Sequence, residues 1–412
     1  MAEIAGQGSP QACAGLRAVE LGGYAAGPAI GKQLANFGAE VIRIESRSRP
    51  DGFRTNYPPF KDNLPGMERA GIFSFFNDGK RSVALNLKTA RGQELARQLV
   101  ATADVVIENF TPGTMSRLGL AYEALSAANP RLIMLSSCNQ GQTGPHARHP
   151  GFGSHLTSLS GFTHLLGYPD ETPVLLYGPY IDYIAVGYGL VAILAALLRR
   201  RRSGMGTYID LSQYEAGLQF LAPALLDLFV NGRVPGRNGN RHPSAAPHGV
   251  FPCRGQDRWC ALSVHSDEEW ARFVQALGSP AWGQEEAFRT VLGRKAQEDR
   301  LESLVAGWTR QREREEVVAQ LQSRGLRAYP VNSMADLFAD PQLRHRQTWR
   351  SVEHPVQGRI HAQAPPFSLT STPARLEKPA PCLGADNNYV LGTILGLSPD
   401  EIDELGRQGV VE

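Results

Sequence analysis

Short apolar runs alternate with helical patterns along the first third of the chain. The run 16–21 is followed by the segment 28–37, which begins with proline, repeats apolar residues at helical spacing and is followed by Gly38. Proline near a helix start and glycine just past its end are typical helix boundaries. Further strands are predicted at 41–44, 82–87, 104–107 and 131–136. Strands separated by single helices predict an α/β fold with a mostly parallel sheet covered on both faces.

The middle of the chain departs from this alternation. The stretch 141–179 is rich in Gly, His, Pro, Ser and Thr, and it precedes the most apolar segment, 184–198. About 15 apolar residues are fewer than the roughly 20 that cross a membrane, so a buried core helix is predicted and no membrane partner is expected.

Composition shifts again at 231–252, where Gly, Pro and Asn exclude regular structure. The pattern beyond predicts a strand at 259–264 and a helix beginning at Ser266, with Glu269 three residues later. Two further helical stretches, 295–308 and 313–322, complete the pattern of a small α/β domain. The chain then becomes extended and proline-rich before a last helix capped by Ser398.

Length and charge narrow the possibilities. A chain of 412 residues is longer than one core usually supports, which favours two domains. Lys and Arg number 42 against 40 Asp and Glu, too small an excess for a nucleic-acid partner. Five scattered cysteines and an N-terminal stretch without a basic, apolar signal pattern favour a cytoplasmic protein.

The turn after the first strand partly matches a dinucleotide-binding fingerprint. Gly22, Gly23 and Gly27 lie between a strand and a helix and precede Glu45, but Tyr24 replaces the second required glycine. A nicotinamide cofactor is therefore not expected. GxSxG, HExxH, GxxxxGK[ST] and CxxC motifs are absent from the sequence, and the histidine pairs lack acids at metal-ligand spacing, so no metal site is predicted.

Asp182 is the acid of greatest interest. It precedes the apolar helix in GPYIDYIAVGYG, where an N-cap role is the simplest interpretation. An ionised carboxylate held beside a glycine-rich loop can also attack an activated acyl compound. Both interpretations fit the spacing.

Several long motifs, in order, carry a resemblance to a known family: GLRAVELGGYAAGP, GAEVIRIESRSRPDGFR, FNDGKRSVALNLK, ADVVIENFTPGTMSRLGL, NPRLIMLSSCNQGQTGP, GPYIDYIAVGYG, GNRHPSAAPHGVFPC and DPQLRHR. The chain resembles the class III CoA-transferases, which include formyl-CoA transferase, the crotonobetaine/carnitine CoA-transferase and the methylacyl-CoA racemases. The resemblance covers nearly the whole chain.

This resemblance implies a fold and an assembly. The fold is a Rossmann-like large domain with a parallel sheet, completed by the C-terminal segment, plus a smaller α/β domain, in an interlocked dimer. The implied segments are 1–205 (large domain), 206–230 (linker), 231–325 (small domain), 326–350 (linker) and 351–412 (return segment).

The resemblance makes Asp182 the catalytic nucleophile, which forms a mixed anhydride and then an aspartyl-CoA thioester. No cofactor is implied beyond the CoA of the substrates. Because CoA carries phosphates and an adenine ring, its site needs cations and apolar surface. The implied CoA contacts are Arg47, Asn109, Phe110, Thr114 and Arg117, with Lys80 and Arg81 as weaker candidates.

Departures from the family pattern restrict the range of expected substrates. Ala25 replaces a glutamine of formyl-CoA transferase, so formyl-CoA and oxalate are not expected. Asn139 and Gln140 replace a Gly-Phe pair and, being polar, are predicted near the acyl group. The racemase histidine aligns near Phe152, and His155 is offset by three positions.

These observations predict a CoA-transferase that takes CoA from succinyl-CoA or a similar dicarboxylic thioester, a preference based on family frequency and the basic loop 233–241. The acceptor is a carboxylic acid, with an aromatic or branched acid such as a benzylsuccinate as one option. A homodimer is expected, and a heteromer with a related subunit is the other arrangement. Two alternatives remain open: an acyl-CoA racemase or epimerase, and a non-catalytic CoA-binding subunit of a heteromeric transferase.

Overall fold

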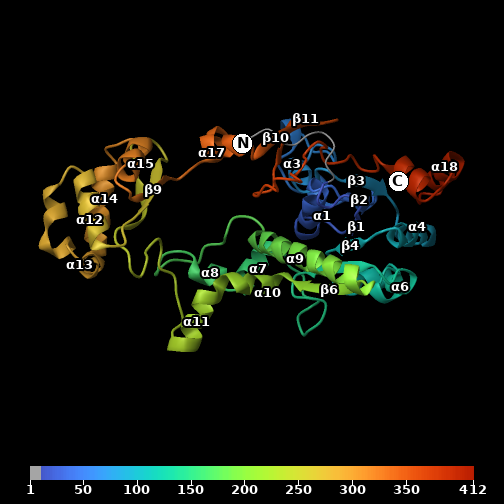
Figure 1. Ribbon diagram of the computed structural model, residues 1–412, viewed down its shortest axis with the longest axis horizontal. Helices are drawn as coiled ribbons and strands as arrows, with labels where there is room; N and C mark the ends of the chain where they lie inside the picture. The colour runs from blue at the N-terminus through green and yellow to red at the C-terminus, as the bar shows by residue number, and fades with distance from the viewer. Residues whose placement is uncertain (1–10) are drawn as a thin grey trace. The chain divides into compact units, whose positions relative to one another are not determined.

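The computed structural model describes residues 11–412 and divides the chain into two compact units (Figure 1). The large unit contains the described residues up to Thr163, together with Leu175–Arg233 and Gln342–Glu412. The small unit contains His164–Val174 and Val234–Pro341. Each unit has its own buried core.

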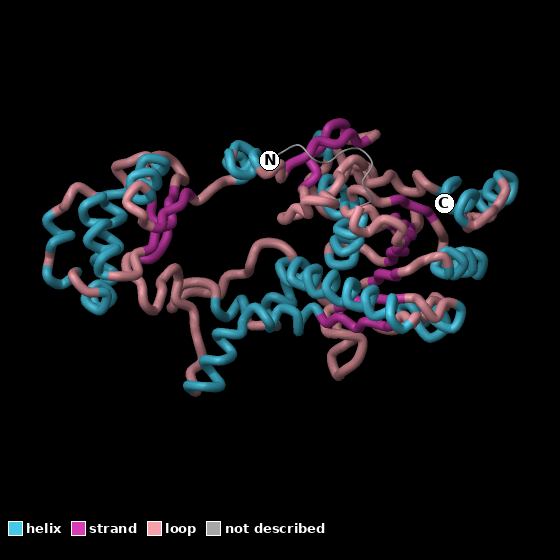
Figure 2. Tube along the Cα trace, viewed as in Figure 1, coloured by secondary structure: helices cyan, strands magenta, loops and turns pink. Residues whose placement is uncertain are grey.

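A six-stranded parallel sheet forms the centre of the large unit (Figure 2). The strand order β3-β2-β1-β4-β5-β6 reverses direction between β1 and β4. Val19 of β1 pairs with Ile42 on one side and Val106 on the other. These three residues share one face, and the preceding residues Ala18, Val41 and Val105 share the other, as suits a sheet that helices cover on both sides. The strands are β1 (Arg17–Leu21), β2 (Glu40–Glu45), β3 (Arg81–Ala84), β4 (Val105–Glu108), β5 (Ile133–Cys138) and β6 (Thr207–Ser212).

Two hydrophobic clusters cover the two faces of this sheet. One contains Ile30 of α1 and Ile193 of α9, together with the hairpin β10–β11. The other contains Leu95 of α4 and Leu405 of α18. Alternate residues of β1 and β4 enter opposite clusters, as a pleated strand requires. The elements involved are α1 (Ala26–Asn36), α9 (Tyr180–Ser203), β10 (Trp349–His354), β11 (Gly358–Gln363), α4 (Ala90–Ala101), α6 (Tyr122–Ala128), η5 (Asn388–Ile394) and α18 (Pro399–Arg407).

The C-terminal segment returns to the β3 edge of the sheet. Val411 bridges to Leu85, and the Asn387 side chain accepts a hydrogen bond from the Ala84 backbone N–H at 2.8 Å. The return segment therefore supplies part of the large unit's core. The remaining elements of the large unit are α2 (Gly52–Thr55), η1 (Lys61–Asn63), α3 (Gly71–Asn77), α5 (Thr114–Arg117), α7 (Gly153–Leu159), α10 (Gln213–Leu218), η2 (Gln219–Leu221) and α11 (Ala222–Asn231). The short helices α8 (Phe162–Leu165) and α17 (Pro341–His345) cross the boundary between the two units in sequence.

The small unit packs helices on a three-stranded antiparallel sheet. Ser266 is the N-cap of α12, as the sequence predicts, and accepts a hydrogen bond from the Glu269 backbone N–H. Phe273, Leu301 and Val317 come from three helices into one core. The elements are β7 (His248–Pro252), β8 (Trp259–Ser263), β9 (Arg327–Pro330), α12 (Asp267–Ala276), η3 (Ala281–Gln284), η4 (Glu286–Phe288), α13 (Val291–Ala296), α14 (Glu298–Thr309), α15 (Arg314–Gln322) and α16 (Met334–Ala339).

The two segments predicted as linkers contain regular structure. The segment 206–230 contains β6, which pairs along its length with β5, and helices α10 and α11. The segment 326–350 begins with β9, which pairs with β8, so the small unit extends beyond 325 to Pro341. Polar edge strands with few apolar residues resemble linkers in sequence, and only their backbone pairing identifies them.

The core helix predicted at 184–198 is present as part of α9. The helix α9 is longer, and one face packs on α1, β5 and β6 while Val191, Leu194 and Leu198 are exposed. By length and composition alone it is the one helix within residues 11–412 that is apolar enough to cross a membrane. Its packing against the sheet is that of a core helix with a second, uncovered apolar face.

Candidate active site

Most of the predicted site residues gather at the carboxyl edge of the parallel sheet. Arg47 follows β2, Asn109 and Phe110 follow β4, and Asn139 and Gln140 follow β5. The turn Gly22–Tyr24 follows β1 at the same edge. Ligands of open α/β sheets bind at this edge where the strand order reverses, here between β1 and β4.

Tyr24 holds a left-handed backbone conformation, with φ of +60°, in the turn after β1. Its backbone N–H donates to Asp51 at 3.1 Å. The Asn109 side chain accepts from the Gly23 N–H at 3.0 Å and donates to the Gly23 carbonyl at 2.7 Å. A Cβ on Gly22 would overlap the Asn109 side chain. Asn109 therefore fixes this turn, and its amide is engaged by the protein itself.

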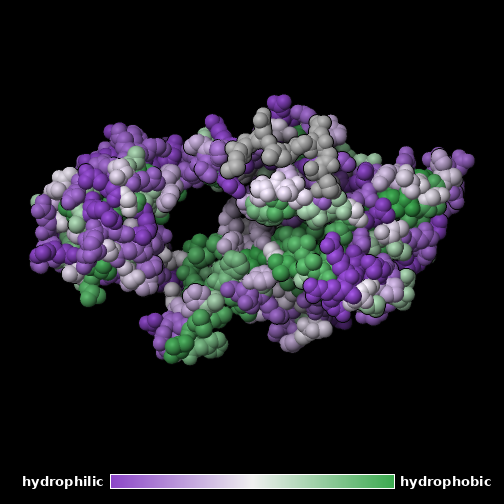
Figure 3. Space-filling view, viewed as in Figure 1, coloured by the Kyte–Doolittle hydropathy of each residue, from purple (hydrophilic) through white to green (hydrophobic). Residues whose placement is uncertain are grey.

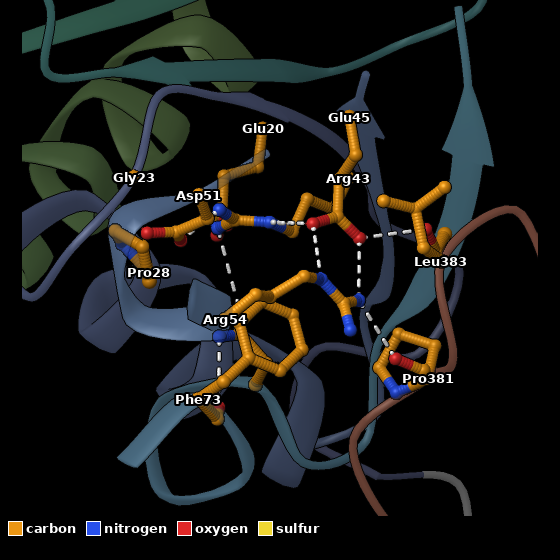
Figure 4. A network of polar contacts seen from close by, with 12 residues as sticks. Glu20, Gly23, Pro28, Arg43, Glu45, Asp51, Arg54, Phe73, Pro381 and Leu383 are labelled. Carbon is orange, nitrogen blue, oxygen red and sulfur yellow. Dashed lines mark hydrogen bonds and ion pairs between the residues drawn. The ribbon is translucent and has the colours of Figure 1, made fainter. Parts of the chain in front are cut away.

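A buried network of charges supports the turn from below (Figure 4). Arg43 pairs with Glu20 at 2.6 Å, and its guanidinium also pairs with Asp51. Arg54 binds both oxygens of Glu45 at 2.9 and 2.8 Å. Although burial opposes it, hydrogen bonds and charge from Arg54 hold the pKa of Glu45 down at about 2. These charges are paired and rigid, so they are scaffold rather than reactive groups.

Lys80 and Arg81, the weaker candidates for CoA contacts, are both paired with acids of the fold. Lys80 is 3% exposed, and its Nζ lies 2.8 Å from Glu20 inside the charge network. Arg81 begins β3 and pairs with Glu40 at 3.1 Å and Asp386 at 2.9 Å. Both cations thus form ion pairs with acids of the protein itself. Their positions in the sequence do not reveal these partners.

Arg47, Thr114 and Arg117 lie at or near the surface, where a ligand can reach them. The Arg47 backbone N–H donates to the Glu412 carboxylate at 2.5 Å, while its side chain is exposed. Arg117 donates to the Thr114 hydroxyl at 2.7 Å. Phe110 is half-buried and packs against the core cluster that includes Leu95. These residues are open to the phosphates and ring of a ligand such as CoA.

Asp182 lies in the first turn of α9, which begins at Tyr180, so it is not the N-cap. It is partly accessible, and a Cβ on Gly153 would lie 2.1 Å from its Oδ2 atom. Loss of surrounding water raises the pKa of Asp182 to about 7, against a slight lowering by its own backbone N–H. With a pKa of about 7, the Asp182 carboxyl is partly protonated at neutral pH, and the reactive carboxylate is one of its two forms.

Asn139 reaches the same loop as Asp182. Its side-chain amide donates to the Gly151 carbonyl at 2.9 Å, two residues before Gly153. Asn139 therefore fixes the loop against which the Asp182 carboxyl rests. Gln140 is half-buried, and within residues 11–412 no hydrogen bond to its side chain is formed. Its amide is free to contact a ligand.

Aromatic side chains surround this loop, a feature that the sequence analysis missed. The Tyr24 ring lies 5.5 Å from Phe152 and 6.1 Å from Tyr57, between ring centroids. Tyr183 stacks on Phe76 at 5.8 Å, directly after Asp182 in the chain. The five rings come from five separate segments, so no local pattern in the sequence could join them.

Glu108 is a second unusual carboxyl that sequence reasoning missed. It ends β4, is 2% exposed and borders a cavity of about 230 Å³ that is also lined by Thr111, Ser136 and Tyr208. Burial raises the pKa of Glu108 to about 7, against the lowering effect of the hydrogen bond that the Phe110 backbone N–H donates to it at 2.8 Å. The motif ENF thus contributes a buried acid as well as the clamp Asn109.

One cluster has the residue types of a metal site: Glu68, His354 and Cys382. Arg54 already lies 2.8 Å from Glu68 and supplies a positive charge there. His354 Nδ1 accepts hydrogen bonds from the backbone N–H groups of Val356 and Gln357, so a neutral ring carries its proton on Nε2. Both features oppose metal binding, and the cluster is better described as a hydrogen-bonded part of the scaffold.

The racemase alternative finds little support in the geometry. His155 Nδ1 accepts a hydrogen bond from the Phe152 backbone N–H at 3.2 Å, within the first turn of α7. The aromatic ring of Phe152 occupies the position where the resemblance expects a histidine. A base paired with Asp182 is therefore not formed by these residues.

Comparisons with known proteins show the family to which the chain belongs. The sequence model of CoA-transferase family III matches residues 13–387. The chain is 34% identical, over 92% of its length and 95% of the relative, to the succinate–glutarate CoA-transferase of Agrobacterium fabrum. It is 31% identical, over 99% and 100%, to the succinyl-CoA–D-citramalate CoA-transferase of Chloroflexus aurantiacus. A CaiB/BaiF family protein from Brucella suis has a similar structure, with a TM-score of 0.86 and 32% identity, covering 93% of this chain and all of that one.

Proposed function

The chain belongs to CoA-transferase family III, and we propose that it moves CoA from succinyl-CoA to a small dicarboxylic acid through a covalent intermediate on Asp182. The relatives named above support CoA transfer and a succinyl donor. The observation that carries the mechanism is the unpaired, partly accessible carboxyl of Asp182 beside Gly153.

In the first half of the reaction, an Asp182 carboxylate oxygen attacks the thioester carbonyl of the donor. The C–S bond breaks, CoA leaves as thiolate, and a mixed anhydride remains on Asp182. The thiolate then attacks the aspartyl carbonyl, which releases the donor acid as its carboxylate and leaves an aspartyl-CoA thioester. The acceptor carboxylate runs these two steps in reverse order and departs as its CoA thioester.

The chain's own residues have separate roles in this scheme. Asn139 holds the loop under the Asp182 carboxyl, and the free Gln140 amide donates a hydrogen bond to the oxyanion of the tetrahedral intermediate. The exposed Arg47 and Arg117 bind CoA phosphates. Cys138 does not compete as nucleophile, because burial raises the pKa of its thiol to about 12.

Trapping tests the mechanism directly. The purified chain is incubated with succinyl-CoA and hydroxylamine, digested, and the mass of the peptide containing Asp182 is measured. We expect a hydroxamate on Asp182 that is absent from Asp182→Asn protein. Turnover by the purified chain alone would exclude a non-catalytic subunit. A racemase would be indicated by three results together. The peptide would be unmarked, the substrate's α-proton would exchange for deuterium, and the reaction would need no acceptor acid.

The acceptor is identified by a panel of acids at fixed succinyl-CoA. We expect transfer to glutarate and to citramalate, the acids that the relatives' names contain. Benzylsuccinate belongs in the same panel, because the rings of Tyr24, Tyr57 and Phe152 provide an apolar wall for an aromatic acid.

A second copy of this chain is the proposed partner, in the interlocked arrangement that the resemblance implies. Apolar side chains gather on the surface over α9–α11 (Figure 3). Val191 is 67% exposed, and Phe229 and Val230 are 78% and 76% exposed. Exposed apolar area of this kind is usually covered by a partner. Light scattering on the purified chain is expected to give the mass of a dimer, and Phe229→Glu is expected to weaken it.

A further inference from the structure

A dicarboxylic substrate has a second carboxylate that Asp182 does not bind. This inference rests on the proposed function, in which one carboxylate of succinate or glutarate reacts and the other stays charged. A second carboxylate inside a site needs a cation and hydrogen-bond donors.

The basic loop 233–241 does not supply that cation. Arg233 pairs with Asp227 at 2.8 Å, and Arg241 pairs with Glu302 at 2.9 Å and with Asp299. Arg237 donates to the His164 carbonyl. Acids of the same chain neutralise two of the loop's three arginines, and the third is held by a backbone carbonyl, so the loop is a weak basis for predicting a dicarboxylic substrate.

Arg49 offers a free cation at the carboxyl edge of the sheet. It lies in the loop after β2, is exposed, and within residues 11–412 no ion pair or hydrogen bond of its side chain is formed. The nearest acid in sequence, Asp51, is occupied by Arg43 and by the backbone N–H groups of Tyr24 and Phe53. Arg49 is therefore not neutralised by the scaffold.

Two phenol groups connect this loop to the reacting carboxyl. Tyr24 and Tyr57 have ring centroids 6.1 Å apart. The Tyr24 ring also lies 5.5 Å from Phe152, the residue before Gly153, whose Cα rests against Asp182. Burial and the neighbouring Tyr57 and Asp51 raise the pKa of Tyr24, while the charge of Arg49 lowers it. Because the net direction is upward, the hydroxyl keeps its proton and remains a donor at neutral pH.

We propose that Arg49, together with the hydroxyl groups of Tyr24 and Tyr57, binds the distal carboxylate of the dicarboxylic substrate and so selects dicarboxylic over monocarboxylic acids. The aromatic wall of Tyr24 and Phe152 spans the distance between this carboxylate and Asp182. Arg49 is thus a specificity residue, and Arg47, two residues earlier, belongs to CoA.

The test compares glutarate with pentanoate, an acid of the same chain length that lacks the second carboxylate. Arg49→Ala is expected to raise KM for glutarate about 10- to 100-fold, the usual effect of removing a charged hydrogen-bond donor, and to leave KM for pentanoate unchanged. Arg49→Lys should recover part of the loss, since the charge returns without the guanidinium geometry. Tyr57→Phe should raise KM for glutarate only a few-fold.

Arg47→Ala is the matched control, an exposed arginine in the same loop. It is expected to raise KM for the CoA thioester and to affect glutarate and pentanoate equally. The proposal is overturned if Arg49→Ala changes both acids alike or changes only KM for the thioester. A wild-type protein that transfers CoA between no pair of acids contradicts the proposed function instead, so the two failures are distinguishable.

Discussion

Two groups of carboxylates in the large unit have opposite environments. Glu20, Glu45 and Asp51, under the turn after β1, are all paired with arginine or lysine, and the pKa of Glu45 is held at about 2. Within residues 11–412 no cation pairs with Asp182, and burial raises its pKa to about 7. Pairing makes a buried carboxylate part of a rigid framework. The absence of a partner leaves Asp182 available for a substrate.

The largest effect is expected when the unpaired carboxyl is removed. Asp182→Asn keeps the size of the side chain and removes the nucleophile, so kcat is expected to fall at least ~1,000-fold. Steady-state transfer from succinyl-CoA measures it. A variant retaining a tenth of wild-type kcat would show that the carboxylate does not react.

Removing a paired carboxylate should instead act on stability. Glu45→Gln leaves the buried Arg54 and Arg43 without part of their compensation, and about 3–5 kcal/mol of unfolding free energy should be lost. Chemical denaturation measures this change. Glu404→Gln, which changes only exposed contacts on α18, is the control and should leave stability nearly unchanged.

The third expected effect, on kcat, comes from the close contact between Gly153 and the Asp182 carboxyl. Gly153→Ala places a methyl group against Oδ2 of Asp182, so the carboxyl must move and kcat is expected to fall about 10- to 100-fold. Gly187→Ala is the control on α9, where an added Cβ meets no atom within 4 Å, and activity should stay unchanged. Equal activities of the two variants would argue against a fixed Asp182 geometry.

The smallest effect is a pH-dependent stabilisation. The native state favours protonated Asp182, whereas the unfolded chain ionises it near pH 3.8. Ionisation therefore costs native stability progressively between about pH 4 and pH 7, and the full cost applies above pH 7. The loss of unfolding free energy caused by this ionisation is at most about 4 kcal/mol. Because Asp182 is partly in contact with water, we expect a loss of ~2 kcal/mol.

Asp182→Asn removes this cost. The variant should exceed wild type in stability by that amount at pH 8 and equal it at pH 4, as measured by denaturation at both values. The same titration predicts that kcat/KM of wild type rises with pH up to about 7 and then levels off. A variant less stable than wild type at pH 8 would instead indicate a structural role for the carboxylate in the first turn of α9.

The sequence predicted the elements that depend on local patterns. Pro28 lies at the start of α1 and Gly38 follows it, and Ser266 and Ser398 cap α12 and α18. Asp182 stood out because its motif combines an acid, a glycine-rich loop and an apolar helix. The polar strand β6 was missed because its pairing with β5 involves residues some 70 positions away.

Charged residues show most clearly what cannot be predicted from the sequence. Lys80, Arg81 and Arg49 have similar surroundings in the sequence, yet Lys80 is buried against Glu20, Arg81 bridges Glu40 and Asp386, and Arg49 is exposed. No local signal separates a scaffold cation from a binding cation, because the distinction depends on partners that the fold brings from distant segments.

The sequence by itself thus determined the α/β class, the family and the position of the candidate nucleophile, since periodicity, caps and motifs are local properties. The tertiary structure decided which charges are neutralised, which aromatic rings surround Asp182 and how far its pKa rises. Those properties depend on burial and on long-range electrostatic pairing, which exist only once the chain has folded.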